Sequence, residues 1–226
     1  MKGTEQTPEE ELQQSQEVLR WATRKDRRDS SFTVKAMIEV ADQLAKQDRW
    51  PEEVTLREQI ATALRDARGA ENESTVQAEW MLAFCLIRLE RFDDAEPWLA
   101  HVVAGRALAL GQDNPETLMA MAWKASVAKK LGRVDDAREQ QEYVVQGYES
   151  AGLGESSQAM LASLNLAATL SELHEREAAS RLLRHILAVR SRTLGPDDPL
   201  TAQVRTLLEH HEGPGGVEPH GGAYTL

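Results

Sequence analysis

The stretch that decides the fold is Leu-Gly-Arg-Val-Asp-Asp-Ala at residues 131–137. Its last five residues have a counterpart, Arg-Phe-Asp-Asp-Ala, at residues 91–95, so Arg133 and Arg91 stand 42 positions apart. Further steps of 42 reach Arg-Trp-Pro-Glu-Glu at 49–53 and Glu-Arg-Glu-Ala-Ala at 175–179. A fixed step of this size is typical of a chain built from repeated supersecondary units. The stretch therefore predicts a turn that recurs once in every repeat.

A column of helix-capping residues keeps the same step of 42. Its members are Ser30, Asn72, Asn114, Ser156 and Asp198. Each has a side-chain oxygen of the kind that accepts an unpaired N–H from the first turn of a helix. A second column carries acids or proline, which suit the first turn of another helix; it consists of Glu9, Pro51, Asp93, Asp135 and Glu177. Two helix starts in every 42 residues predict a repeat made of two helices.

The two columns predict four helix pairs. The first helices cover about residues 32–48, 74–90, 116–132 and 158–174, and the second about 51–67, 93–109, 135–151 and 177–193. Half repeats precede and follow the pairs, at about 8–24 and 201–211. Two apolar columns run through the repeats, namely Ala41, Ala83, Ala125 and Ala167 in the first helices and Ile60, Val102, Val144 and Ile186 in the second. Because each pair needs a neighbour to cover its apolar face, the predicted fold class is all-α, an α-solenoid of stacked helix-turn-helix repeats.

The predicted domain organisation has three parts. Residues 1–7 form a disordered N-terminus, residues 8–211 form the solenoid, and residues 212–226 form a glycine-rich tail. Five glycines and two prolines in the tail exclude a regular helix there.

Composition narrows the classes of partner and compartment. The 226 residues carry a net charge of −11, which argues against a broad nucleic-acid-binding surface. The basic run at 24–28 is interpreted as a solvated helix end. No apolar run approaches the roughly 18 residues that a membrane span needs, and the polar start lacks the pattern of a signal peptide. The only cysteine, Cys85, lies in an apolar helical stretch and is predicted to pack. A cytoplasmic protein without membrane contact is expected.

These features together resemble the tetratricopeptide repeat proteins, and among them the 42-residue variety of kinesin light chain. The resemblance rests on the turn at 131–137, the alanine column, the Leu-Gly-x-Asp-x-Pro-x-Thr connectors at 110–117 and 194–201, and Asn-Leu-Ala at 165–167. It covers about residues 8–211 and implies a right-handed solenoid whose first helices line a groove for extended peptides. The family's histidine before proline is Asn114 or Asp198 here, and Met81 and Trp123 stand in a column where the family often has asparagine.

The groove columns of the first helices change chemical type from repeat to repeat, as a ligand-binding surface should. We predict an apolar-aromatic groove with a basic rim. Its residues are Trp80, Met81, Phe84, Ile87, Arg88, Met119, Trp123, Lys129, Lys130, Leu161 and Asn165, of which Arg88, Lys129 and Lys130 form the rim. The competing interpretation is that Trp80 and Phe84, and likewise Trp123, simply pack between repeats. The tail offers a related hypothesis, in which Val217, Tyr224 and Leu226 occupy this groove or that of a second molecule.

The function predicted from these residues is that of a non-catalytic adaptor for a protein or peptide segment. No catalytic motif, phosphate loop or metal-ligand spacing appears, so no cofactor and no metal are predicted. The recurring Asp-Asp pairs at 93–94 and 135–136 are explained as helix starts. The alternatives are a regulator that senses small molecules or peptides, a tailoring enzyme for natural products or peptides that uses the same groove, and a structural subunit.

Overall fold

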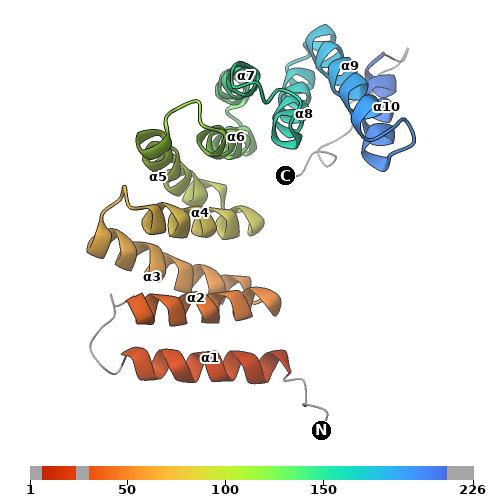
Figure 1. Cartoon of the computed structure of the whole chain (residues 1–226). Coiled ribbons are helices and arrows are strands. Elements are labelled where there is room, and N and C mark those ends of the chain that lie inside the picture. Colours follow the sequence, from red (N-terminus) through yellow and green to blue (C-terminus); the bar gives the residue numbers. More distant parts are fainter. Residues whose placement is uncertain (1–6, 24–30, 213–226) are drawn as a thin grey trace. The chain divides into compact units, whose positions relative to one another are not determined.

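The computed structural model describes residues 7–23 and 31–212 (Figure 1). Over these residues it contains ten α-helices and no strand, so the predicted all-α fold class is confirmed. Several predictions concern residues outside the described ranges: the N-terminal segment 1–6, the basic run 24–28, the cap Ser30, and the tail with Val217, Tyr224 and Leu226.

The described chain divides into two compact units, and the first is Met1–Leu110. Its helices are α1 (Pro8–Thr23), α2 (Ser31–Lys46), α3 (Trp50–Arg68), α4 (Glu73–Arg88) and α5 (Phe92–Leu110), and each packs on the next (Figure 1). One core cluster, which includes Met37, Ala41 and Ile60, joins α2 to α3. Another, which includes Val54, Leu82 and Ala95, joins α3 to α4 and α5. The helix pairs of unit 1 therefore share a core, as the repeat pattern predicts.

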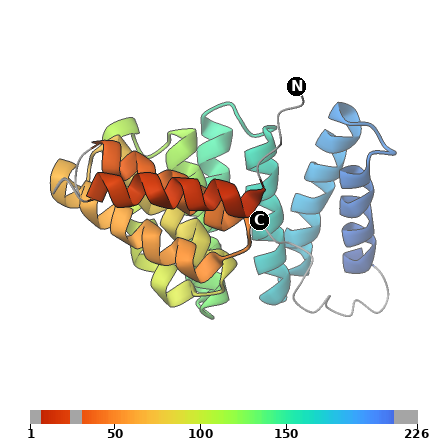
Figure 2. The ribbon, with the colours of Figure 1, turned by 90° about the horizontal axis from the view of Figure 1, so that it is seen from below.

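The second unit, Gly111–Leu226, is built in the same way. Its helices are α6 (Pro115–Lys130), α7 (Val134–Ser150), α8 (Ser157–Glu172), α9 (Arg176–Thr193) and α10 (Pro199–Glu212). Leu118, Val144 and Leu166 belong to a cluster that joins α6, α7 and α8. Leu183, Ile186 and Val204 belong to one that joins α8 and α9 to α10, which lies beside α9 (Figure 2). That the two units form one continuous solenoid stays a prediction.

The capping column begins the helices as predicted. Asn72, Asn114 and Ser156 each accept a backbone N–H from the first turn of α4, α6 and α8. The carboxylate of Asp198 does the same for Leu200 at the start of α10. Both apolar columns are buried, since no member of either is more than 2% exposed. The local sequence therefore fixes where the helices start and which face each one buries.

The first helices end two residues earlier than predicted, for a common reason. A residue with positive φ follows each of them: Asp48, Glu90, Gly132 and His174, again 42 apart. The next backbone N–H then reaches back to a carbonyl five residues earlier, as from Arg91 to Leu86 at 2.9 Å. This left-handed residue and backward hydrogen bond form the motif that closes many helices.

Candidate functional site

Unit 1 contains a pocket of about 440 Å³ between α2, α3 and α4. Helices α2 and α4 are first helices of neighbouring repeats, and α3 lies between them in the chain. The apolar part of the lining is Val34, Ile38, Ile60, Leu64, Ala78 and Met81. The charged part is Lys35, Asp42, Arg57 and Arg68. The pocket is thus lined by two first helices, α2 and α4, and by the second helix α3.

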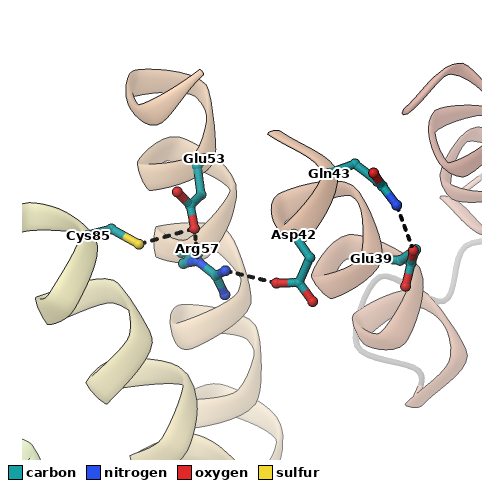
Figure 3. Close-up of polar contacts among 6 residues, drawn as sticks. All are labelled: Glu39, Asp42, Gln43, Glu53, Arg57 and Cys85. Carbon is teal, nitrogen blue, oxygen red and sulfur yellow. Dashed lines mark hydrogen bonds and ion pairs between the residues drawn. The ribbon is translucent and has the colours of Figure 1, made fainter. Parts of the chain in front are cut away.

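An ion-pair network underlies one end of this pocket. The Nε of Arg57 donates to the Oε1 of Glu53 at 2.6 Å, and its Nη2 donates to the Oδ1 of Asp42 at 2.9 Å (Figure 3). Arg57 and Glu53 are buried, being 6% and 2% exposed, whereas the Asp42 side chain is 51% exposed. The network therefore joins a buried carboxylate to one that a ligand can reach. Glu39 and Gln43 form a separate hydrogen bond on α2 (Figure 3).

The repeat register shows why this network is local to one repeat. Glu53 takes the place that Ala95, Ala137 and Ala179 take in the later repeats. In the same way Arg57 stands where the next repeat has Leu99. Arg57 and Cys85 both bond to one oxygen of Glu53, Oε1, while its other oxygen, Oε2, is buried without a hydrogen-bond partner among the described residues. Burial acts to lower the pKa of Arg57, but the hydrogen bond to Glu53 and the nearby negative charges outweigh it and raise that pKa. The guanidinium is therefore a fixed positive charge.

Cys85 of α4 completes the network from the other side (Figure 3). Its thiol donates to the Oε1 of Glu53 at 3.2 Å, and the residue is 4% exposed. Burial, followed by the hydrogen bond to Glu53 and that group's charge, raises the pKa of the thiol to about 12. Cys85 is thus a protonated packing residue with the opposite properties to a nucleophile.

The predicted groove residues of unit 1 divide between the pocket and other contacts. Met81 lines the pocket. The ring of Trp80 lies 4.7 Å from the guanidinium of Arg106, and both residues are largely covered within the unit. Arg88 stacks at 3.5 Å on the ring of Trp50 and lies 6.0 Å from the Phe84 ring. Ile87 packs against the cluster that joins α3 to α4 and α5. Unit 1 thus brings Met81 to the pocket, and the pocket lining does not include the aromatic residues.

The predicted residues of unit 2 lie on α6 and α8. Met119, Trp123 and Lys129 are partly buried, and Lys130 is exposed. Lys129 pairs with Glu172 at 3.2 Å. On α8, Leu161 is 39% exposed and Asn165 is 7% exposed. The basic rim predicted from Lys129 is therefore partly neutralised by a neighbouring acid.

Sequence reasoning predicted Met81 from the pocket lining but missed the charged residues Lys35, Asp42, Arg57 and Arg68. The available signal was the register. In the later full repeats the place of Glu53 is held by Ala95, Ala137 and Ala179, and Glu53 precedes Arg57 by four residues, the spacing of an ion pair on one helix face.

Neither a metal-binding cluster nor a membrane-spanning helix occurs among the described residues. Within residues 7–23 and 31–212, no three or more His, Cys, Asp or Glu side chains are grouped in a way that could hold a metal ion. Within the same ranges, no helix combines the length and the hydrophobicity that a bilayer crossing demands.

Comparison with known proteins agrees with the repeat architecture. A family model described as tetratricopeptide repeat matches residues 81–116 and 161–200. No curated protein sequence matches the chain. Among solved structures, the nearly identical TPR-like repeats of kinesin light chain type from Podosopora anserina have a TM-score of 0.73 at 22% identity, covering 82% of this chain and 88% of that one.

Two further structures show the same fold. BtubC (BKLC) from P. vanneervenii has a TM-score of 0.71 at 16% identity, covering 92% of this chain and 84% of that one. YrrB, described as a TPR protein with an unusual peptide-binding site, has a TM-score of 0.56 at 18% identity, covering 86% and 85%. The predicted resemblance is therefore confirmed: residues 81–116 and 161–200 match the tetratricopeptide-repeat model, and the chain shares the fold of kinesin-light-chain-like repeat proteins.

Proposed function

We propose that this protein is a non-catalytic binding module that holds an extended peptide or protein segment against its first helices. Tetratricopeptide repeats are in general scaffolds for binding proteins and peptides, and YrrB, which shares the fold, has a peptide-binding site by its description. The fold alone does not choose a ligand. The choice has to come from the residues of the site.

The observation that carries the proposal is the pocket of unit 1. Its volume of about 440 Å³ lies within the ~300–1,000 Å³ typical of ligand sites. Its lining is mainly apolar, with a few charged groups of which Asp42, Arg57 and Arg68 are held by their own partners, which is the composition that combines affinity with orientation. The backbone of an extended segment would remain at the mouth while one side chain enters.

The register extends the proposal to the other predicted residues. Trp80 and Phe84 hold on α4 the places that Ile38 and Asp42 hold on α2. Met119 and Leu161 correspond to Lys35, and Trp123 and Asn165 correspond to Met81. Because Ile38, Asp42, Lys35 and Met81 line the pocket, their equivalents are proposed to contact ligand elsewhere along the chain. Ile87, Arg88, Lys129 and Lys130 are proposed to flank these contacts.

Selection from a phage-displayed library of random dodecamer peptides tests the proposal. The wild-type protein should enrich a peptide family, and the affinity of synthetic members is then measured by calorimetry. Ile38→Glu introduces a charge into the apolar lining and should weaken binding at least tenfold. Leu108→Glu is the matched control, because Leu108 is 66% exposed on α5 and is absent from the pocket lining.

Two results would count against the proposal. Failure to enrich any peptide, together with a small molecule retained in native mass spectra, would favour the alternative of a small-molecule sensor. Equal affinities of wild type and Ile38→Glu would move the binding site away from the pocket.

We also propose that the chain's own tail can occupy the binding surface in place of a separate peptide. Val217, Tyr224 and Leu226 supply apolar side chains behind glycines. Deleting residues 213–226 should then speed hydrogen exchange in the helices that the tail covers. Unchanged exchange would exclude self-occupation.

A further inference from the structure

We infer that the pocket of unit 1 selects an extended peptide in which an apolar residue stands between a basic and an acidic residue. The basic residue would pair with Asp42 at one end, and the acidic residue with Lys35 and Arg68 at the other. This inference rests on the proposed function and adds the charge pattern of the ligand.

The anionic end follows from the charges of the network. Two carboxylates, Glu53 and Asp42, share the single positive charge of Arg57. Glu53 is buried and bonded to Arg57 at 2.6 Å, so it is the permanent counter-ion. Asp42 is the surplus negative charge, and half of its side chain is open to solvent at the pocket. Arg57 fixes one oxygen of this carboxylate, which leaves a preoriented acceptor for a cation.

The cationic end lies two helical turns away on α2. Lys35 precedes Asp42 by seven residues, which is about 10 Å along the axis on the same face. Arg68 closes α3 and donates to the hydroxyl of Ser74 in the first turn of α4 at 3.1 Å. Helices α2 and α3 follow each other through a short turn, so the start of α2 and the end of α3 meet at this end (Figure 1). Lys35 and Arg68 thus give the pocket a positively charged end opposite the negatively charged Asp42; these two charged ends are called its poles.

Apolar residues occupy the interval between the poles. Ile38 from α2, Leu64 from α3 and Ala78 from α4 line it. An extended peptide rises by about 3.3 Å per residue, so about three residues cover the distance from Asp42 to Lys35. Because alternate side chains of an extended peptide share a face, a peptide with a basic, an apolar and an acidic residue at every second position presents all three side chains to the pocket, and its two charges stand about 13 Å apart along the backbone. In a chain with a net charge of −11, two cations at one end of an apolar pocket are also a local departure from the overall charge.

The buried pair is poorly explained by stability alone. The next repeat fills the same places with Ala95 and Leu99, which are 0% and 1% exposed. Replacing a buried ion pair by well-packed apolar residues is often neutral or stabilising. A role in fixing Asp42 gives Glu53 and Arg57 a reason to be charged.

The experiment repeats the dodecamer selection on the wild type, Asp42→Asn, Lys35→Gln/Arg68→Gln and Glu39→Gln. Asparagine at 42 keeps an acceptor for Arg57 but removes the charge. Glu39→Gln is the matched control, since Glu39 is an exposed acid on α2 that is absent from the pocket lining. We expect the wild type and Glu39→Gln to enrich a basic, an apolar and an acidic residue. Asp42→Asn should lose the preference for the basic residue alone, and Lys35→Gln/Arg68→Gln the preference for the acidic one.

A synthetic wild-type-selected dodecamer makes the test quantitative. Changing its basic residue to glutamine should weaken binding to the wild type by roughly tenfold and to Asp42→Asn by less than about twofold, as expected for a directly coupled charge pair. Peptides enriched for an apolar residue with no charge pattern would overturn this inference and leave the proposed function intact. An empty selection would overturn both. If circular dichroism shows that Asp42→Asn is not folded, the wild type alone decides. The inference is then overturned if changing the basic residue of the peptide to glutamine weakens its binding to the wild type by less than twofold.

Discussion

Glu53 bonds to the buried guanidinium of Arg57 and accepts the thiol hydrogen of Cys85, so the stability of unit 1 should depend on it. Glu53→Ala should lower the free energy of unfolding by about 3 kcal/mol, because it leaves the buried guanidinium of Arg57 with only half-exposed Asp42. Glu53→Ala/Arg57→Leu copies the pair of the next repeat and should restore most of that stability. Urea unfolding followed by circular dichroism measures both. A double variant no more stable than Glu53→Ala would show that the site cannot accept the apolar pair.

Cys85 gives a prediction about reactivity and pH. Its pKa of about 12 in the folded protein stands above the ordinary 9.0, so the folded state holds the proton more tightly than the unfolded state. Its contribution to stability is fully present below pH 9 and declines as the pH rises from 9 towards 12. At pH 8 the folded thiol should react with iodoacetamide on the order of 10³-fold more slowly than the thiol in urea, in proportion to the thiolate fractions. Equal rates, followed by mass spectrometry, would mean that the thiol is accessible.

At the scale of the helix, the turn that ends each first helix is the feature with a measurable cost. Glu90 adopts a φ of 56°, where side chains are strained, while Gly132 fills the equivalent place in the next repeat. Glu90→Gly should raise the free energy of unfolding by about 0.5–1 kcal/mol, since the relief of strain exceeds the entropy that glycine adds to the unfolded chain. Glu90→Ala keeps the strain and is the control. Equal stability of both variants would assign any effect to the loss of charge.

The helices illustrate what can be predicted from the sequence and what cannot. The caps at Asn72, Asn114 and Ser156 fixed the helix starts, because capping is a local interaction between a side chain and the next turn. The predicted first helices run two residues too far in all four repeats, with Gly132 as with Asp48, Glu90 and His174, because a repeat pattern fixes the length of the unit but not the residue at which the backbone turns left-handed. The pocket was only partly predicted. Met81 could be predicted from its place in the repeat, but the pairing of Arg57 with Asp42 depends on how α2 and α3 pack.

At the scale of the whole molecule, the division into two compact units predicts which helices a core mutation destabilises. Ile60 is 2% exposed and belongs to the core between α2 and α3. Ile60→Ala should cost about 2–5 kcal/mol, and because repeats interact mainly with their neighbours, that loss should be local. Hydrogen exchange followed by mass spectrometry should show faster exchange in α2, α3 and α4, with α8, α9 and α10 unchanged. A uniform increase in all helices would mean that the chain unfolds as one cooperative body.

The four charged residues of the pocket all lie in the helix pair formed by α2 and α3, between Lys35 and Arg68. A preference for a ligand's charge pattern that depends on the residues of one repeat is present only where that repeat is present. Duplication of these residues would copy the preference, and deletion of one 42-residue unit would remove it without disturbing the caps of the others. Transferring the charge-pattern recognition to a designed repeat array would therefore require α4 together with α2 and α3, because Ala78 and Met81 of α4 line the pocket and Ser74 of α4 holds Arg68.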